Sequence, residues 1–192
     1  MKIIAFSGNS NTGKTTAIHF LRDFLLARNP ELRIQLFHES AREYIEAHGG
    51  WGIDDMHDFE RYVFQCETKR IQELQDAKEK QRYDYAFIDR TTLDCFIYSY
   101  WNLVHGDLEV IDYTHGSTNL LAQSKEVYDH VVFFTTPIKK DSRFDIYNNE
   151  HINAIFQHSI HSLYQDKVIT YTNNMFFQDN LENTVLGDIM LS

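Results

Sequence analysis

One segment restricts the fold of this chain more than any other, the run Gly8-Asn9-Ser10-Asn11-Thr12-Gly13-Lys14-Thr15. It satisfies the pattern G-x-x-x-x-G-K-[ST], with an apolar run typical of a strand before it (2–7) and a stretch of helical periodicity after it (14–28). Such a loop forms where a strand leads into a helix, because its glycines let backbone N–H groups turn inward. Residues 8–15, here called the phosphate loop, therefore predict a phosphate-binding segment within an α/β fold.

The chemistry expected of the phosphate loop is nucleotide binding. Its N–H groups and the positive N-terminus of the following helix attract phosphates, Lys14 reaches the β- and γ-phosphates, and Thr15 supplies an oxygen to Mg²⁺. We therefore expect ATP and Mg²⁺ as cofactors. The predicted nucleotide-binding residues are Gly8, Asn9, Ser10, Asn11, Thr12, Gly13, Lys14, Thr15 and Thr16.

The rest of the chain alternates between apolar runs of strand length and longer stretches of helical periodicity. This alternation is typical of a parallel sheet with helices on both faces, a three-layer α/β sandwich. The length favours a single domain over residues 1–192. The predicted strands are 2–7, 33–38, 85–89, 130–135 and 167–172, and the predicted helices are 14–28, 56–82, 92–105, 119–128, 149–164 and 180–191.

Charge and cysteine content narrow the choice of partners. The chain has 18 Lys and Arg against 28 Asp and Glu, a formal charge of −10, and this charge would repel a nucleic-acid backbone, so duplex nucleic acid is not an expected partner. Cys66 and Cys95 match no metal spacing, and so few cysteines favour a reducing cytoplasm. No apolar stretch approaches the roughly 20 residues that span a bilayer, so we expect no membrane partner.

An acid and a base follow the third predicted strand, in the run Phe87-Ile88-Asp89-Arg90-Thr91. Ligands of open α/β sheets bind along the carboxyl edge of the strands, where these residues fall. Asp89 is suited to the Mg²⁺ shell, and Arg90 can bind a phosphate through two hydrogen bonds. The structural alternative is that the pair only caps the next helix.

A second carboxylate, Glu39, follows the second predicted strand. It could accept the proton of an attacking hydroxyl group, and Arg42 lies one helical turn away. The structural alternative is strong here, because Ser40 makes a good N-cap and Glu43 completes a capping box. We therefore interpret Glu43 as structural and Glu39 as a candidate catalytic residue, and leave Arg42 open between the two.

A basic loop follows the fourth predicted strand and contains Lys139, Lys140 and Arg143. Such a loop could close over the phosphates and exclude water, as lids do in phosphotransferases. We predict a lid around residues 137–150, with Arg143 stabilising charge on the γ-phosphoryl group. The alternative is an ordinary solvated loop.

These elements occur together in one order: the phosphate loop, Glu-x-x-Arg-Glu-Tyr from Glu39, Asp-Arg-Thr-x-x-Asp from Asp89, and the basic loop. Together they resemble the AAA-domain P-loop kinases related to the nicotinamide riboside kinase domain of the bacterial NAD regulator. The Asp-Arg-Thr run is also similar to the Asp-Arg signature of thymidylate and deoxynucleoside kinases. The chain departs from thymidylate kinases in having no clear Arg-Glu-Pro segment after the second strand.

The resemblance implies a nucleotide-kinase-like P-loop NTPase fold, with five parallel strands in the order 2-3-1-4-5. It implies an acceptor bound between the ends of the second and third strands and the lid. By the same resemblance, Lys14 and Thr15 bind ATP–Mg²⁺, Glu39 and Asp89 serve in acid–base chemistry or metal binding, and Arg90 and Arg143 contact phosphate.

We therefore expect an ATP- and Mg²⁺-dependent kinase of a small molecule, either a nucleoside, a nucleotide or a nicotinamide riboside-like acceptor. The alternative is a P-loop ATPase or nucleotide-dependent regulatory switch, which needs a positioned water instead of an acceptor. Against it, the chain lacks the Asn-Lys-x-Asp guanine signature. A homo-oligomer is compatible with the sequence.

Overall fold

A computed structural model of the chain describes residues 1–10, 12–48, 56–104, 113–135, 150–171 and 187. Within them a parallel sheet of five strands has the order β2-β3-β1-β4-β5, as predicted. The strands are β1 (Lys2–Gly8), β2 (Ile34–Phe37), β3 (Tyr85–Asp89), β4 (His130–Phe134) and β5 (Val168–Tyr171). The helices are α1 (Lys14–Arg28), α2 (Ser40–Ala47), α3 (Met56–Glu79), α4 (Thr92–Val104), α5 (Tyr113–Val127), α6 (Glu150–Tyr164) and the short 3₁₀ helix η2 (Gln165–Lys167).

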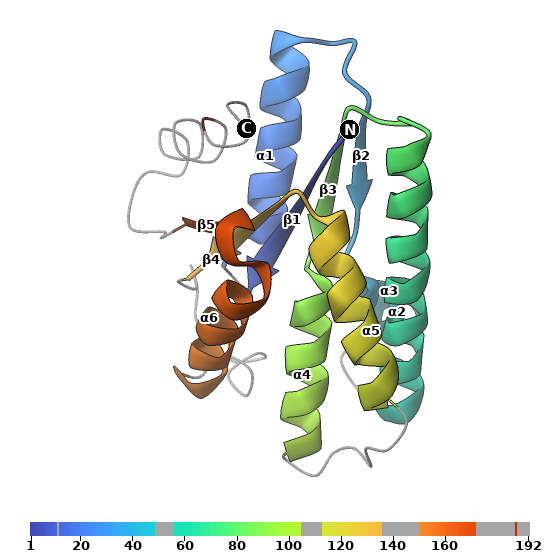
Figure 1. Ribbon diagram of the computed structural model, residues 1–192, viewed down its shortest axis with the longest axis vertical. Coiled ribbons are helices and arrows are strands. Elements are labelled where there is room, and N and C mark those ends of the chain that lie inside the picture. Colours follow the sequence, from blue (N-terminus) through green and yellow to red (C-terminus); the bar gives the residue numbers. More distant parts are fainter. Residues whose placement is uncertain (11, 49–55, 105–112, 136–149, 172–186, 188–192) are drawn as a thin grey trace.

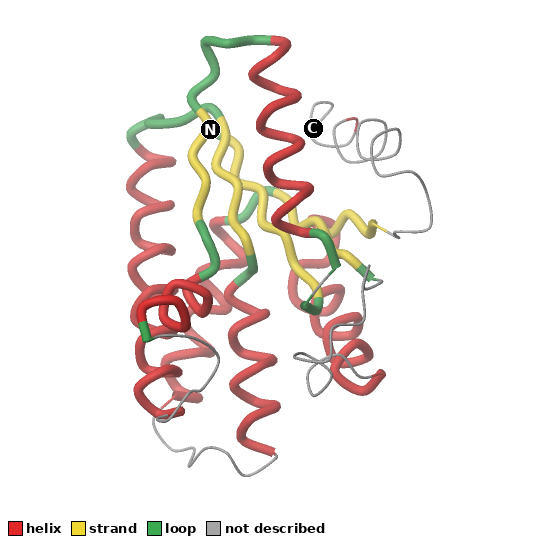
Figure 2. Tube along the Cα trace, turned by 180° about the vertical axis from the view of Figure 1, so that it is seen from behind, coloured by secondary structure: helices red, strands yellow, loops and turns green. Residues whose placement is uncertain are grey.

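The sheet is covered on both faces, which makes three layers (Figures 1 and 2). Alternate residues of β1 point to opposite sides. Ile3 and Ala5 join the core beneath α3, α4, α5 and α6, whereas Ile4 and Phe6 pack against α1. The central strand is buried on both faces, which explains its continuous apolar run.

Among the ends of the predicted helices, the largest difference occurs in α3, which ends without glycine. The helix predicted over 56–82 ends at Glu79 because Gln81 adopts a left-handed conformation, with φ of 50°. The Arg82 N–H then donates to the Ala77 carbonyl and the Gln81 N–H to the Lys78 carbonyl, a Schellman arrangement. Because Gln81 occupies the left-handed position that is usually a glycine, the sequence pattern did not indicate the end of the helix, and the predicted helix was three residues too long.

Three further predictions concern helices of the second half of the chain. α5 begins at Tyr113, six residues before the predicted start at 119, and α6 matches the helix predicted over 149–164 within one residue. The helix predicted over 180–191 lies outside the described residues, apart from residue 187. No helix within the described ranges is long and apolar enough to cross a membrane.

Candidate active site

The phosphate loop leaves the sheet at Gly8, the last residue of β1, and enters α1 at Lys14. Gly8 has φ of 132°, and a Cβ built there would lie 2.5 Å from the backbone oxygen of Phe134 on β4. Gly13, the N-cap of α1, has φ of 90°. Both positions require glycine, since side chains rarely adopt these conformations and at Gly8 there is also no space.

Lys14 folds back over the loop that precedes it. Its Nζ donates to the carbonyl oxygens of Gly8 at 2.8 Å and Asn9 at 2.7 Å, and to Thr12 Oγ1 at 3.2 Å. Burial lowers the pKa of Lys14 to about 8, and the Arg90 cation acts in the same direction while nearby carboxylates oppose it. The structure thus holds a buried ammonium group at the centre of the loop, where an anion would relieve the cost of its charge.

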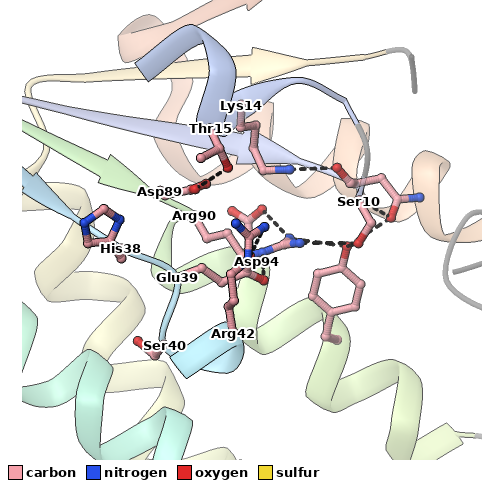
Figure 3. Close-up of polar contacts among 12 residues, drawn as sticks. Ser10, Lys14, Thr15, His38, Glu39, Ser40, Arg42, Asp89, Arg90 and Asp94 are labelled. Carbon is pink, nitrogen blue, oxygen red and sulfur yellow. Dashed lines mark hydrogen bonds and ion pairs between the residues drawn. The ribbon is translucent and has the colours of Figure 1, made fainter. Parts of the chain in front are cut away.

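Thr15 and Asp89 meet at the carboxyl edge of the sheet, with Thr15 Oγ1 donating to Asp89 Oδ2 at 2.6 Å (Figure 3). The other oxygen, Asp89 Oδ1, is buried and has no hydrogen-bond partner among the described residues. Oxygen ligands of this kind fit Mg²⁺, which proteins bind through one or two side chains while phosphates and water complete the shell. Among the described residues, no group of three or more His, Cys, Asp or Glu side chains could hold a metal ion. Thr15 and Asp89 are therefore candidate Mg²⁺ ligands by their oxygen chemistry.

Arg90 and Glu39 form a nearly buried ion pair at the ends of β3 and β2. Arg90 Nε donates to Glu39 Oε1, and Arg42 reaches the same carboxylate at 3.5 Å. Burial of Glu39 opposes ionisation, but the cations of Arg90, Lys14 and Arg42 outweigh it and lower the pKa of Glu39. The carboxylate is therefore held in its ionised form.

The Arg90 guanidinium also contacts the phosphate loop. Its Nη2 donates to Ser10 Oγ and its Nη1 to the Tyr98 hydroxyl, each at 3.3 Å, and it lies 5.0 Å from the centre of the Tyr98 ring. Burial would lower the pKa of Arg90, but Glu39 and its other neighbours raise it well above the usual value. Arg90 therefore connects the predicted base to the nucleotide-binding segment.

The start of α2 corrects one prediction. Ser40 is not the N-cap, because α2 begins at Ser40 itself and its N-cap, Glu39, makes no side-chain capping bond. The Ser40 hydroxyl instead donates to Glu67 Oε1 at 3.1 Å and accepts from Arg70 Nη2 at 2.7 Å. Glu67 and Arg70, a buried ion pair on α3, bind the Ser40 hydroxyl that a capping box would use. The capping-box interpretation was therefore wrong.

Sequence reasoning missed two side chains that support the site. Arg70 of α3 donates to the carbonyl oxygens of His38 at 2.7 Å and Arg90 at 3.4 Å, and so it fixes the backbone next to Glu39 and at Arg90. Asp94 of α4 accepts hydrogen bonds from both the end of β1 and the turn after β3. Asp94 ends the Asp-Arg-Thr-x-x-Asp run, which is the sequence signal that could have drawn attention to it.

A cavity of about 210 Å³ adjoins the phosphate loop at Asn9, whose amide nitrogen donates to Asn153 Oδ1 at 2.9 Å. It lies between the end of β4 and α6 and is lined by Phe133, Phe134, Thr135, Glu150, Ala154, Phe156 and Gln157 as well. The cavity places open space beside the loop, where a ligand group could extend.

The remaining predicted site residues divide into two groups. Thr16 is exposed on the first turn of α1, one residue beyond Thr15. Asn11, Arg143 and almost all of the lid predicted around 137–150 lie outside the described residues. The structure thus gathers the candidates from the ends of β1, β2 and β3.

Comparisons with known proteins agree with this geometry. A family model described as an AAA domain matches residues 3–166. A crystal structure of thymidylate kinase from Ehrlichia chaffeensis is 15% identical with a TM-score of 0.63, covering 99% of this chain and 97% of that one. A deoxyadenosine kinase from M. mycoides is 16% identical with a TM-score of 0.59, covering 99% and 100%. These likenesses show a nucleotide-kinase-like fold, and the comparison with curated proteins gave no match.

Proposed function

The chain belongs to the AAA-domain family, and on this basis we propose that it is an ATP- and Mg²⁺-dependent kinase of a nucleoside, nucleotide or nicotinamide riboside-like acceptor. The observation that carries the proposal is the Arg90–Glu39 pair, which holds an ionised carboxylate beside the phosphate loop. A nucleotide switch needs only a positioned water, whereas a kinase needs a group that orients an acceptor hydroxyl or phosphate.

On the nucleotide side, the loop N–H groups bind the phosphates and Lys14 turns from the loop carbonyls to the β- and γ-phosphates. Thr15 and Asp89 would hold Mg²⁺, which would neutralise charge on the phosphates. Asp89 Oδ1, which is buried and has no hydrogen-bond partner among the described residues, supports this role.

On the acceptor side, Glu39 orients the attacking hydroxyl. The oxygen of the acceptor hydroxyl forms a bond to the γ-phosphorus. The bond from that phosphorus to the β–γ bridging oxygen breaks, and ADP leaves. The hydroxyl proton passes to Glu39. Since the transition state is loose, this proton moves late, and a carboxylate of low pKa is sufficient. Arg90 keeps Glu39 ionised and can offer its second Nη2–H to a phosphate, beside the one that Ser10 accepts.

The two similar structures are named for kinases of thymidylate and deoxyadenosine, and this supports a nucleoside or nucleotide as the first acceptor class to test. The role of Arg143 on a closing lid, the homo-oligomer and the cytoplasmic location stay predictions from the sequence. The free thiols of Cys66 and Cys95 are in keeping with a reducing compartment.

The test is a phosphoryl-transfer screen with ATP–Mg²⁺ against nucleosides, nucleoside monophosphates and nicotinamide riboside, with the Lys14→Ala variant as the blank. ADP release that depends on one acceptor class, together with a phosphorylated product, supports the kinase. ADP release that no acceptor changes would support the ATPase instead.

A further inference from the structure

Asp94 lies in the first turn of α4 and is fully buried. Its carboxylate accepts hydrogen bonds from residues on two different segments of the site. Ser7 Oγ donates to Oδ2 at 2.8 Å and the Gly8 N–H to Oδ1 at 3.1 Å, and the Thr91 N–H donates to Oδ2 at 2.9 Å. In Figure 3 the labelled Asp94 lies beside Arg90.

Part of this arrangement is an ordinary helix cap. Thr91 directly precedes α4, its hydroxyl accepts from the Asp94 N–H at 3.2 Å, and the Asp94 side chain accepts from the Thr91 N–H in return. This is the reciprocal pattern of a capping box. A cap explains the bonds to Thr91, but it does not explain the bonds to Ser7 and Gly8, which are 87 and 86 residues away in the chain.

The bonds to β1 have a consequence for the site. Gly8 is the first residue of the phosphate loop, and Thr91 follows Arg90 directly. Arg90 has φ of 78°, a strained conformation for a residue with a side chain, which persists only when its surroundings hold it. Asp94 restrains the backbone after Arg90 through its hydrogen bond with the Thr91 N–H. Its Oδ1 also lies 3.7 Å from Arg90 Nη1.

We propose that Asp94 is a positioning residue that keeps the phosphate loop and Arg90 in fixed relation, so that the nucleotide phosphates and the Arg90–Glu39 pair face each other at the correct distance. Its kinetic consequence rests on the proposed kinase function, whereas its effect on nucleotide binding does not.

The Asp94→Asn variant keeps the size of the side chain but replaces one acceptor oxygen with an NH₂ group that faces the same donors. Because misplacement of about 1 Å can cost about a hundredfold in rate, we expect kcat to fall by about tenfold to a hundredfold. The Kd of a non-hydrolysable ATP analogue with Mg²⁺ should rise by about threefold or more, since the Gly8 N–H loses its partner. Unchanged kcat and unchanged Kd would overturn the proposal.

Asp129, the residue before β4, provides a matched control because its carboxylate also accepts a hydrogen bond from β1. Its Oδ2 accepts from the Ile3 N–H at 2.8 Å, at the opposite end of β1 from the loop, and its Oδ1 accepts from Lys78 at 2.7 Å. Asp129→Asn should lower thermal stability and leave the analogue Kd and kcat as in the wild type, with both variants assayed well below their melting temperatures. An equal loss of activity in both variants would make the effect of Asp94 one of general stability.

A double-mutant cycle tests whether Asp94 acts through Arg90. In the Arg90→Ala background, Asp94→Asn should slow transfer by no more than about twofold further, because coupled residues are not additive. Losses that multiply within about twofold would refute the coupling. If the wild type transfers to no acceptor, the kinase proposal fails, and the analogue Kd of Asp94→Asn against Asp129→Asn still decides the role of Asp94.

A milder variant covers the case in which Asp94→Asn does not fold. Ser7→Ala removes one bond from β1 to Asp94 and leaves the Thr91 cap intact. We expect kcat or the analogue affinity to fall by about threefold or more. A folded Ser7→Ala protein with wild-type values of both would contradict the positioning role.

Discussion

The Lys14 ammonium group is buried to 5% exposure and is surrounded by oxygens of its own loop. Burial penalises its charge, and the loop carbonyls and hydroxyl satisfy its donors only as neutral acceptors. Phosphate oxygens carry the charge that those neutral acceptors lack. At the scale of single residues, the phosphate oxygens of a nucleotide should therefore stabilise the Lys14 charge better than the neutral oxygens of the loop do.

Removing that cation should affect turnover more than binding. In Lys14→Ala we expect kcat of the proposed transfer to fall by at least about tenfold, or about 1.4 kcal/mol of transition-state stabilisation. The Kd of a non-hydrolysable ATP analogue should change less, because the loop N–H groups remain. Lys69→Ala, exposed on α3, is the control. Retained turnover in Lys14→Ala would refute the phosphate-loop assignment.

Glu39→Gln separates a catalytic carboxylate from a structural one, because it keeps size and most hydrogen bonding while it removes the charge. The protein should fold, and kcat should fall by about a hundredfold, the lower range for loss of a general base. The control is Glu43→Gln, an exposed position one turn further along α2, which should turn over normally. If Glu39→Gln changed only the melting temperature, Glu39 would belong to the start of α2 and not to the chemistry.

At the scale of elements, β2 is an edge strand that pairs with β3 through a parallel ladder, and an exposed ion pair, Arg33–Asp84, joins the residues just before the two strands. The Arg33 N–H donates to Asp84 Oδ2 at 2.8 Å, and the guanidinium meets Oδ1 at 3.0 Å. The hydrogen bonds from the Arg33 side chain and backbone lower the pKa of Asp84 to about 2. Since β2 leads directly into Glu39, this pair holds the far end of the strand that carries the predicted base.

The pair gives a pH dependence of stability whose sign is fixed by the pKa. Asp84 has a folded-state pKa of about 2 against 3.8 for the ordinary carboxyl, so its contribution is present above about pH 4 and is lost as the pH falls through about 2. Asp84→Asn should lower the urea midpoint at pH 7, and the gap to the wild type should narrow towards pH 3. Asp23→Asn, which removes a surface pair without a backbone bond, should show little gap. A gap for Asp84→Asn that is independent of pH would contradict this assignment.

At the scale of the whole molecule, ligand binding and stability are linked, because the proposed nucleotide contacts join the phosphate loop and α1 to the carboxyl edge of the sheet. A ligand at 100 times its Kd adds about 2.7 kcal/mol of stability. For a chain of 192 residues, this corresponds to about 5–11 °C in melting temperature. We expect a non-hydrolysable ATP analogue with Mg²⁺ to raise the melting temperature by that amount.

The same measurement tests the Mg²⁺ ligands. Asp89→Asn, or removal of Mg²⁺ with a chelator, should reduce the shift to a few degrees or less. An equal shift with and without Mg²⁺ would mean that Thr15 and Asp89 bind no metal in the complex, and that their hydrogen bond is purely structural.

The amino-acid sequence by itself determined the order of strands and helices and the position of the phosphate loop. Both follow from local chemistry. The spacing of apolar residues indicates which faces of the helices and strands are buried. Gly8 and Gly13 indicate backbone conformations that only glycine adopts readily. The strand order came from a family resemblance, and the sheet has that order.

Only the tertiary structure decided which side chains meet. Arg90 binds Glu39 across 51 residues and Asp94 binds Gly8 across 86, and no local pattern records such distances. The end of α3 and the role of Ser40 were also decided there. Gln81 ends α3 in a left-handed conformation, and Glu67 and Arg70 bind the Ser40 hydroxyl. Local periodicity determines whether a segment forms a helix or a strand. The hydrogen-bond partners of polar side chains depend on the packing that brings strand ends and helix starts together.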